Sequence, residues 1–78
     1  MNKVRRKKLQ KVIGKLEEAL AELAEIQEEE EEARDNIPES LQDSEQYEQI
    51  DGYCYTLDDA ASTLEDQIGE LTEIVEGG

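Results

Sequence analysis

The sequence predicts an all-α protein, an antiparallel helical hairpin that assembles into a homo-oligomeric helical bundle. Two long stretches repeat apolar residues every three or four positions, as amphipathic helices do. One strong break, centred on Pro38, separates them. The 78 residues include one cysteine and no histidine, so neither a disulfide nor the usual zinc ligands can staple so small a core. Oligomerisation is the remaining route to a larger core.

The first apolar stripe predicts a helix over about residues 3–34. Leu9, Leu16 and Leu23 are spaced by seven and are assigned heptad position a. The remaining apolar side chains of this stripe are Val12, Ala19 and Ile26 at position d, with Ile13 and Leu20 at position e. We expect all three positions to form the packed face of the helix.

Residues 35–43, DNIPESLQD, predict the turn. Pro38 cannot continue the first helix and restricts Ile37 to extended geometry. Two residues are candidate caps for the next helix: Asp43, in a capping box with Gln46, and Ser44. Because a short turn joins the two helices, we expect them to pack antiparallel.

The second helix is expected over about residues 44–76, completing a single domain of residues 1–78. It repeats the pattern, with Ile50, Leu57, Leu64 and Leu71 at a, Tyr53, Ala60 and Ile74 at d, and Cys54, Ala61, Ile68 and Val75 at e. Layering the a positions of the two helices pairs Leu23 with Leu57.

The charges are unevenly distributed along the chain. The net charge is −14, yet residues 1–15 hold seven of the eight basic residues and no acidic one. Duplex nucleic acid is an unexpected partner for so acidic a protein, because phosphate contacts need a basic face. No apolar run is long enough for a membrane span, so we expect a soluble, cytoplasmic protein with no membrane partner.

The charges of the first helix also run against its macrodipole. Its basic residues lie at the N-terminus and the run 28–32 of glutamates lies near the C-terminus, at a cost of about 0.3–1 kcal/mol per misplaced charge. A second copy lying antiparallel would set each basic end against a glutamate run, as a two-fold dimer does. The sequence therefore predicts that the chain partners itself, most simply as a dimer.

Small residues on the outward side also indicate self-association. Gly14 and Ala21 occupy f positions of the first helix, and Tyr55 and Gly69 those of the second, where a solvated face normally carries charged residues. Close approach of another helix explains them, and tolerated surface drift is the alternative. The predicted oligomer interface comprises Leu9, Leu16, Leu23, Gly14, Ala21, Tyr55 and Gly69.

Five consecutive acids, Glu28, Glu29, Glu30, Glu31 and Glu32, form the densest charge cluster. On a helix they circle the axis, whereas a calcium site needs a loop that wraps oxygens around the ion. We therefore predict an acidic, solvated surface and no metal site. Mimicry of nucleic-acid charge is the alternative use of these residues.

The three tyrosines suggest a ligand site. Tyr47 and Tyr53 are expected to face the core with their hydroxyl groups at its rim. In an antiparallel dimer they would also approach the basic end of the other copy. The resulting candidate ligand site comprises Arg5, Arg6, Lys8, Tyr47 and Tyr53. Arginine for phosphate and tyrosine for stacking on a base suit a small anionic nucleotide.

Enzyme activity is not expected. Cys54 is predicted to be a small core residue. Without histidine, cysteine–histidine catalysis and any histidine general base are excluded. Paired carboxylates would need a concave, partly desolvated site that one hairpin does not offer. We predict no catalytic residue and no cofactor.

A lysine-rich amphipathic helix, the turn segment DNIPESLQDSEQYE and an acidic second helix together resemble small helical proteins encoded by phages and prophages. The resemblance implies a non-catalytic counter-defence factor in the host cytosol. On this basis the expected function is sequestration of a small anionic nucleotide signal in an intersubunit pocket. The alternatives are an acidic inhibitor or nucleic-acid mimic that docks on a host protein, and a structural role in assembly.

Overall fold

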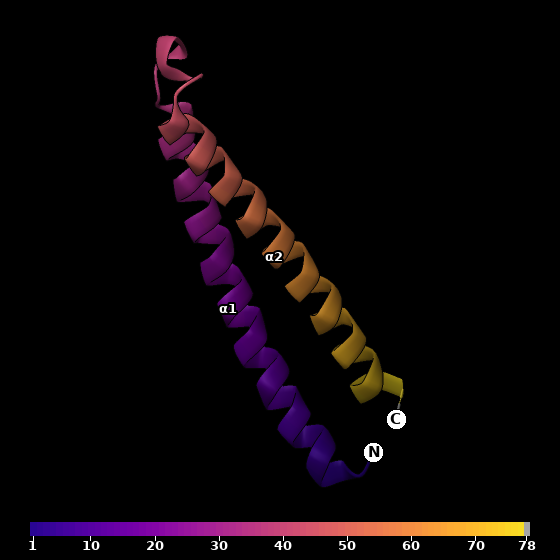
Figure 1. Ribbon diagram of the computed structural model, residues 1–78. Coiled ribbons are helices and arrows are strands. Elements are labelled where there is room, and N and C mark those ends of the chain that lie inside the picture. Colours follow the sequence, from indigo (N-terminus) through magenta and orange to yellow (C-terminus); the bar gives the residue numbers. More distant parts are fainter. Residues whose placement is uncertain (78) are drawn as a thin grey trace.

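A computed structural model, which describes residues 1–77, shows two long helices packed against each other (Figure 1). Helix α1 spans Lys3–Asp35 and helix α2 spans Glu45–Gly77, with a short 3-10 helix, η1 (Glu39–Leu41), between them. The result is a rod whose Cα trace extends over 59 × 15 × 13 Å. Both termini lie at one end, here called the terminal end, and η1 lies at the other, the turn end. The predicted all-α helical hairpin is confirmed. None of the helices in residues 1–77 has the length and apolarity to cross a membrane.

Each end of α1 is capped by an asparagine, which pairs some of the backbone groups that a helix leaves unpaired. The Oδ1 atom of Asn2 accepts a hydrogen bond of 2.9 Å from the backbone N–H of Arg5, which makes Asn2 the N-cap. At the other end, the N–H of Asn36 donates to the carbonyl of Glu32 over 3.0 Å. The break that follows lies at Pro38, whose ψ of 146° takes the chain out of helical geometry.

The start of α2 distinguishes the two candidate caps. The Oγ atom of Ser44 accepts a hydrogen bond of 3.2 Å from the backbone N–H of Tyr47. Ser44, rather than Asp43, is therefore the N-cap of α2. Glu45 and Glu48 lie in the first turn, where acidic side chains favour the positive end of the helix dipole.

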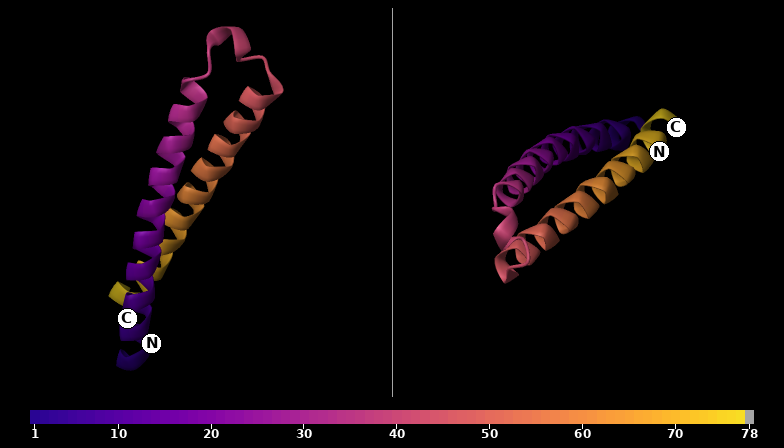
Figure 2. Two further views of the ribbon diagram at one scale, coloured as in Figure 1. Left: turned by 90° about the vertical axis from the view of Figure 1, so that its left-hand side faces the viewer. Right: turned by 90° about the horizontal axis from the view of Figure 1, so that it is seen from above.

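The two helices meet along positions a and e. Figure 2 shows them from two further directions, extending side by side from the turn to the termini. We call their contact surface the seam. Its buried side chains are Ile13, Cys54 and Ile68, and half-buried leucines fill the layers between them, namely Leu9, Leu16, Leu20, Leu23, Leu57, Leu64 and Leu71.

The expectation that position d also packs in the core is wrong. Val12, Ile26, Tyr53 and Ile74 remain 45–51% exposed, so Tyr53 does not face the core. An apolar stripe about 100° wide is too broad for one facing helix to cover. In α2, position e carries only apolar side chains and tyrosine, whereas position d includes Gln67, whose amide would cost about 1–3 kcal/mol to bury unpaired. The seam therefore uses a and e and leaves d outside.

Two hydrogen bonds across the seam report the register of the helices. Gln27 Nε2 donates to Asp58 Oδ1 over 3.1 Å, and Arg34 Nη1 donates to Asp51 Oδ1 over 2.9 Å. Pairing Leu23 with Leu57 would instead place residues 53 and 46 opposite these two donors. Each observed acceptor on α2 is therefore five residues, more than one helical turn, away from the residue that the a-to-a pairing predicts. The reason is that position a of one helix packs against position e of the other.

Candidate binding surface

The d positions of both helices lie on one side of the hairpin. In each helix, position d is about 80° around the axis from the centre of the a/e seam. Because the helices are antiparallel and use the same two positions for contact, both d positions project to the same side. We call this surface the exposed apolar row, made up of Val12, Ala19, Ile26, Tyr53, Ala60 and Ile74. On α2 the exposed amide of Gln67 interrupts the row between Ala60 and Ile74.

Charged side chains border the row along α1. Lys8, Lys15, Glu22 and Glu29 occupy successive g positions and are all exposed. The border is therefore basic toward the terminal end and acidic toward the turn end. Along α2 the corresponding border is largely uncharged, with Thr56 at its middle. An apolar strip with such borders suits the packing of another helical element, and it provides no group for covalent chemistry.

One chain does not bring the predicted ligand residues together. Arg5 and Lys8 are exposed near the terminal end of the rod, whereas Tyr47 and Tyr53 lie near the turn end. Arg6 is half-buried at an e position, and its Nη2 donates to the carbonyl of Met1 over 3.1 Å. Of these residues, only Arg5 and Tyr53 occupy d positions in line with the exposed apolar row.

The predicted interface residues fall on two separate surfaces. Leu9, Leu16 and Leu23 are half-buried in the seam, where α2 covers them. The small residues at f positions and Tyr55, which is 73% exposed, lie on the outer surface. A Cβ atom added at Gly14 or Gly69 would meet nothing within 4 Å. Within one hairpin, then, no close contact requires a glycine at either position.

The acidic run spreads around α1. Glu28, Glu29 and Glu32 are exposed, while Glu30 and Glu31 are half-buried toward α2. The Oε1 atom of Glu31 accepts a hydrogen bond of 3.3 Å from Gln27. Within residues 1–77 no three metal-ligating side chains are grouped so as to hold an ion.

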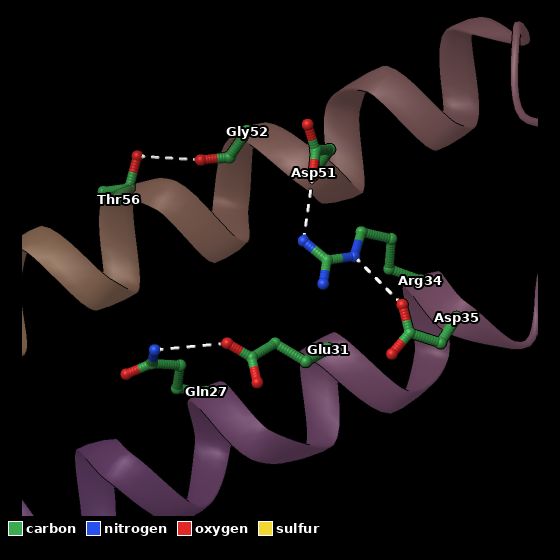
Figure 3. Close-up of polar contacts among 7 residues, drawn as sticks. All are labelled: Gln27, Glu31, Arg34, Asp35, Asp51, Gly52 and Thr56. Carbon is green, nitrogen blue, oxygen red and sulfur yellow. Dashed lines mark hydrogen bonds and ion pairs between the residues drawn. The ribbon is translucent and has the colours of Figure 1, made fainter.

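A polar cluster near the turn end joins the two helices (Figure 3). Arg34 lies between two carboxylates, with Nη1 2.9 Å from Asp51 Oδ1 and Nε 3.3 Å from Asp35 Oδ1. Its hydrogen bonds to these acids raise the pKa of the guanidinium. Arg34 is the only basic residue after position 15 and is surrounded in sequence by acids. That isolation is the sequence signal from which its ion pairs could have been predicted.

An open groove beside this cluster is lined by Glu31, Arg34, Cys54, Tyr55 and Asp58. Its one basic side chain already interacts with two carboxylates, and two further acids line the walls. The groove therefore offers no free positive charge to a phosphate or another anion. In a single hairpin, the strongest candidate for a binding surface remains the exposed apolar row.

Cys54 is expected to react slowly with thiol reagents. It is 4% exposed in the seam, and burial raises the pKa of its thiol. Labelling by a disulfide reagent at pH 8 should be much slower than in denaturant, as followed by absorbance. Equal rates in the two conditions would contradict a packed seam.

The same thiol makes stability depend on pH. The folded protein holds the thiol proton more tightly than the unfolded chain, whose cysteine pKa is about 8.5. The free energy of unfolding of the wild type, relative to Cys54→Ala, should therefore fall as pH rises through and above that value. Urea unfolding at pH 7 and pH 10 would measure this difference.

Comparisons with protein-family models, with curated proteins and with solved structures found no match to this chain. The exposed side chains of the hairpin, their spacing and the charges that border them are therefore what indicates its function.

Proposed function

We propose that the chain is a non-catalytic binding protein that works as a homo-oligomer, most simply a dimer, joined through the exposed apolar row. One observation carries this proposal. The hydrophobic side chains buried within residues 1–77 are only Ile13, Cys54 and Ile68, while apolar side chains recur at every heptad of α1 from Val12 to Ile26 on an uncovered face. Helices with an apolar stripe wider than one partner covers are typical of bundles with more than two helices.

The energetics favour covering the row. A valine, isoleucine or tyrosine that is already half-buried gains about 1 kcal/mol when it is buried completely. A second copy doubles the number of such side chains, because a two-fold interface uses the same surface of each partner. The gain is offset by the freedom lost on association, so we expect a reversible, concentration-dependent assembly.

Sedimentation equilibrium tests the proposal directly. We expect the wild type to have a mass above the 8.9 kDa of one chain. The double variant Val12→Gln, Ile26→Gln should shift the mass down toward that of the monomer without loss of helical circular dichroism. The matched control is Val4→Gln combined with Tyr55→Gln, which removes two exposed apolar side chains outside the row. A wild-type protein that stays at 8.9 kDa up to millimolar concentration would contradict the proposal.

A second candidate function is capture of a small anionic nucleotide. The observation that favours it is that Arg5 extends the row along α1, and Tyr53 lies on the same face at the opposite end of the hairpin. An antiparallel partner would bring Arg5 of one copy close to Tyr53 of the other. The guanidinium could then bind the phosphate of a nucleotide while the tyrosine ring stacks on its base.

Equilibrium dialysis against a mixture of linear and cyclic nucleotides tests this second function. We expect binding by the wild type, loss of binding in Arg5→Gln and retention in Lys11→Gln, which removes the same charge from another side of α1. If the wild type takes up none of the nucleotides, the second function is wrong and the first stands.

A further inference from the structure

We infer that the second copy lies antiparallel on the exposed apolar row, with α1 of each copy packed against α1 of the other. This inference rests on the proposed homo-oligomer and adds to it an orientation and a register. The resulting assembly is a four-helix bundle in which the basic turns of each α1 lie on the acidic turns of the partner's α1.

Charge selects the orientation. Two hairpins can meet face to face with two-fold symmetry in two ways. With the axis along the rods, both turn ends come together and residues 28–32 of one copy approach the acidic turn end of the other. With the axis across the rods, each turn end meets a terminal end, where residues 1–15 hold seven basic side chains. Only the second arrangement places the basic turns of α1 beside residues 28–32 of the other copy.

The charged border of α1 specifies a register. Lys8, Lys15, Glu22 and Glu29 are spaced by seven and are all exposed along one edge of the row. In an antiparallel pair of α1 helices centred near residue 19, Lys15 lies beside Glu22 of the other copy and Lys8 beside Glu29. Symmetry makes each of these pairs twice. No like charges face each other along this edge.

The apolar side chains of α1 fit the same register. Centring the pair near residue 19 sets Val12 against Ile26 of the other copy and Ala19 against its own counterpart. Large side chains then fill the outer layers, and two alanines allow close approach at the middle. Agreement between the apolar and charged positions is the observation that carries the inference.

The arrangement also offsets an unfavourable feature of α1. Its basic N-terminal turns and acidic C-terminal turns oppose the helix dipole. In the antiparallel pair, each of these ends lies beside the oppositely charged end of the other copy.

The border of the row on α2 can also be buried at Thr56. This side chain is uncharged, and its Oγ1 already donates to the carbonyl of Gly52 over 3.1 Å, so burial there leaves no hydroxyl proton unpaired.

Disulfide trapping tests the register. We expect Ala19→Cys to form a disulfide-linked dimer on mild oxidation, because its two copies meet at the symmetry axis. Ala21→Cys, an alanine two positions away on the f face, is the control and should link no more than the wild type. Cys54 stays in every variant, because it is buried in the seam.

Charge reversal tests the orientation. We expect Lys15→Glu and Glu22→Lys each to raise the dimer dissociation constant about tenfold at low salt, since each pair occurs twice. The double variant Lys15→Glu, Glu22→Lys should return the dissociation constant to within about threefold of the wild-type value. The control Lys7→Glu, on the f face, should also keep the dissociation constant within about threefold of the wild-type value. Raising the salt concentration should weaken the wild-type dimer.

The outcomes separate this inference from the proposed function. A species above 8.9 kDa in which Ala19→Cys links no better than Ala21→Cys, or in which the double variant is as weak as the single ones, overturns the antiparallel register and leaves the homo-oligomer standing. A protein that is monomeric at all concentrations overturns both. Efficient linkage of Ala19→Cys together with charge rescue supports both.

Discussion

Replacement of Ile13 by alanine is expected to lower the free energy of unfolding by about 2–4 kcal/mol. Ile13 is 8% exposed and is the one buried residue of α1. Truncation removes buried methyl groups and leaves a cavity that the surrounding side chains fill only in part. A domain of this size has only about 4–12 kcal/mol of stability, and each kcal/mol lost lowers Tm by about 4–8 °C.

Thermal and urea unfolding followed by circular dichroism would measure this change. The matched control is Val4→Ala, which also removes methyl groups from a β-branched side chain of α1 but at a residue that is 62% exposed. We expect the control to change stability by less than about 0.5 kcal/mol. Similar losses for the two variants would show that Ile13 is not packed in the seam.

Replacement of Gly14, Gly52 and Gly69 together by alanine is expected to raise the free energy of unfolding by about 2–3 kcal/mol. All three lie inside helices, and a Cβ atom at any of them would meet nothing within 4 Å. Each glycine lowers stability by about 0.8–1 kcal/mol relative to alanine, because it has more backbone freedom to lose on folding.

The glycine variant also discriminates between the two possible interfaces. Gly77→Ala is the control, because this glycine is the last residue of α2 and also has open space around it. If oligomers form through the f face, alanine at positions 14 and 69 would weaken association even as each chain gains helix stability. If they form through the exposed apolar row, association should be unchanged. Sedimentation equilibrium beside urea unfolding would separate these effects.

The hairpin itself could be predicted from local chemistry. Apolar residues repeating at steps of three and four identify both helices, and Pro38 ends the first because it lacks an N–H and clashes with the preceding turn. These rules act within one segment of chain. The buried position of Cys54 followed from the same heptad assignment.

The candidate site was only partly predictable. The chemistry of Arg5 and Tyr53 predicts a role in ligand binding, and both lie exposed on one face. The expected core position of Tyr53 was wrong, and the pairing of Arg34 with Asp51 across the seam was missed. Both depend on the rotation and register of one helix against the other, which periodicity within a single helix does not specify.

The sequence by itself determined two amphipathic helices, the place of the turn and a chain with a basic start and an acidic remainder. Only the tertiary structure decided which part of the apolar stripe became the seam. Three heptad positions were available, and one facing helix covers two of them. In α2 the e positions hold only apolar side chains and tyrosine, whereas the d positions include the amide of Gln67. In α1 the polar e side chains Gln27 and Arg34 are hydrogen-bonded to Asp58 and Asp51 across the seam. That choice left Val12, Ile26, Tyr53 and Ile74 exposed on a single face.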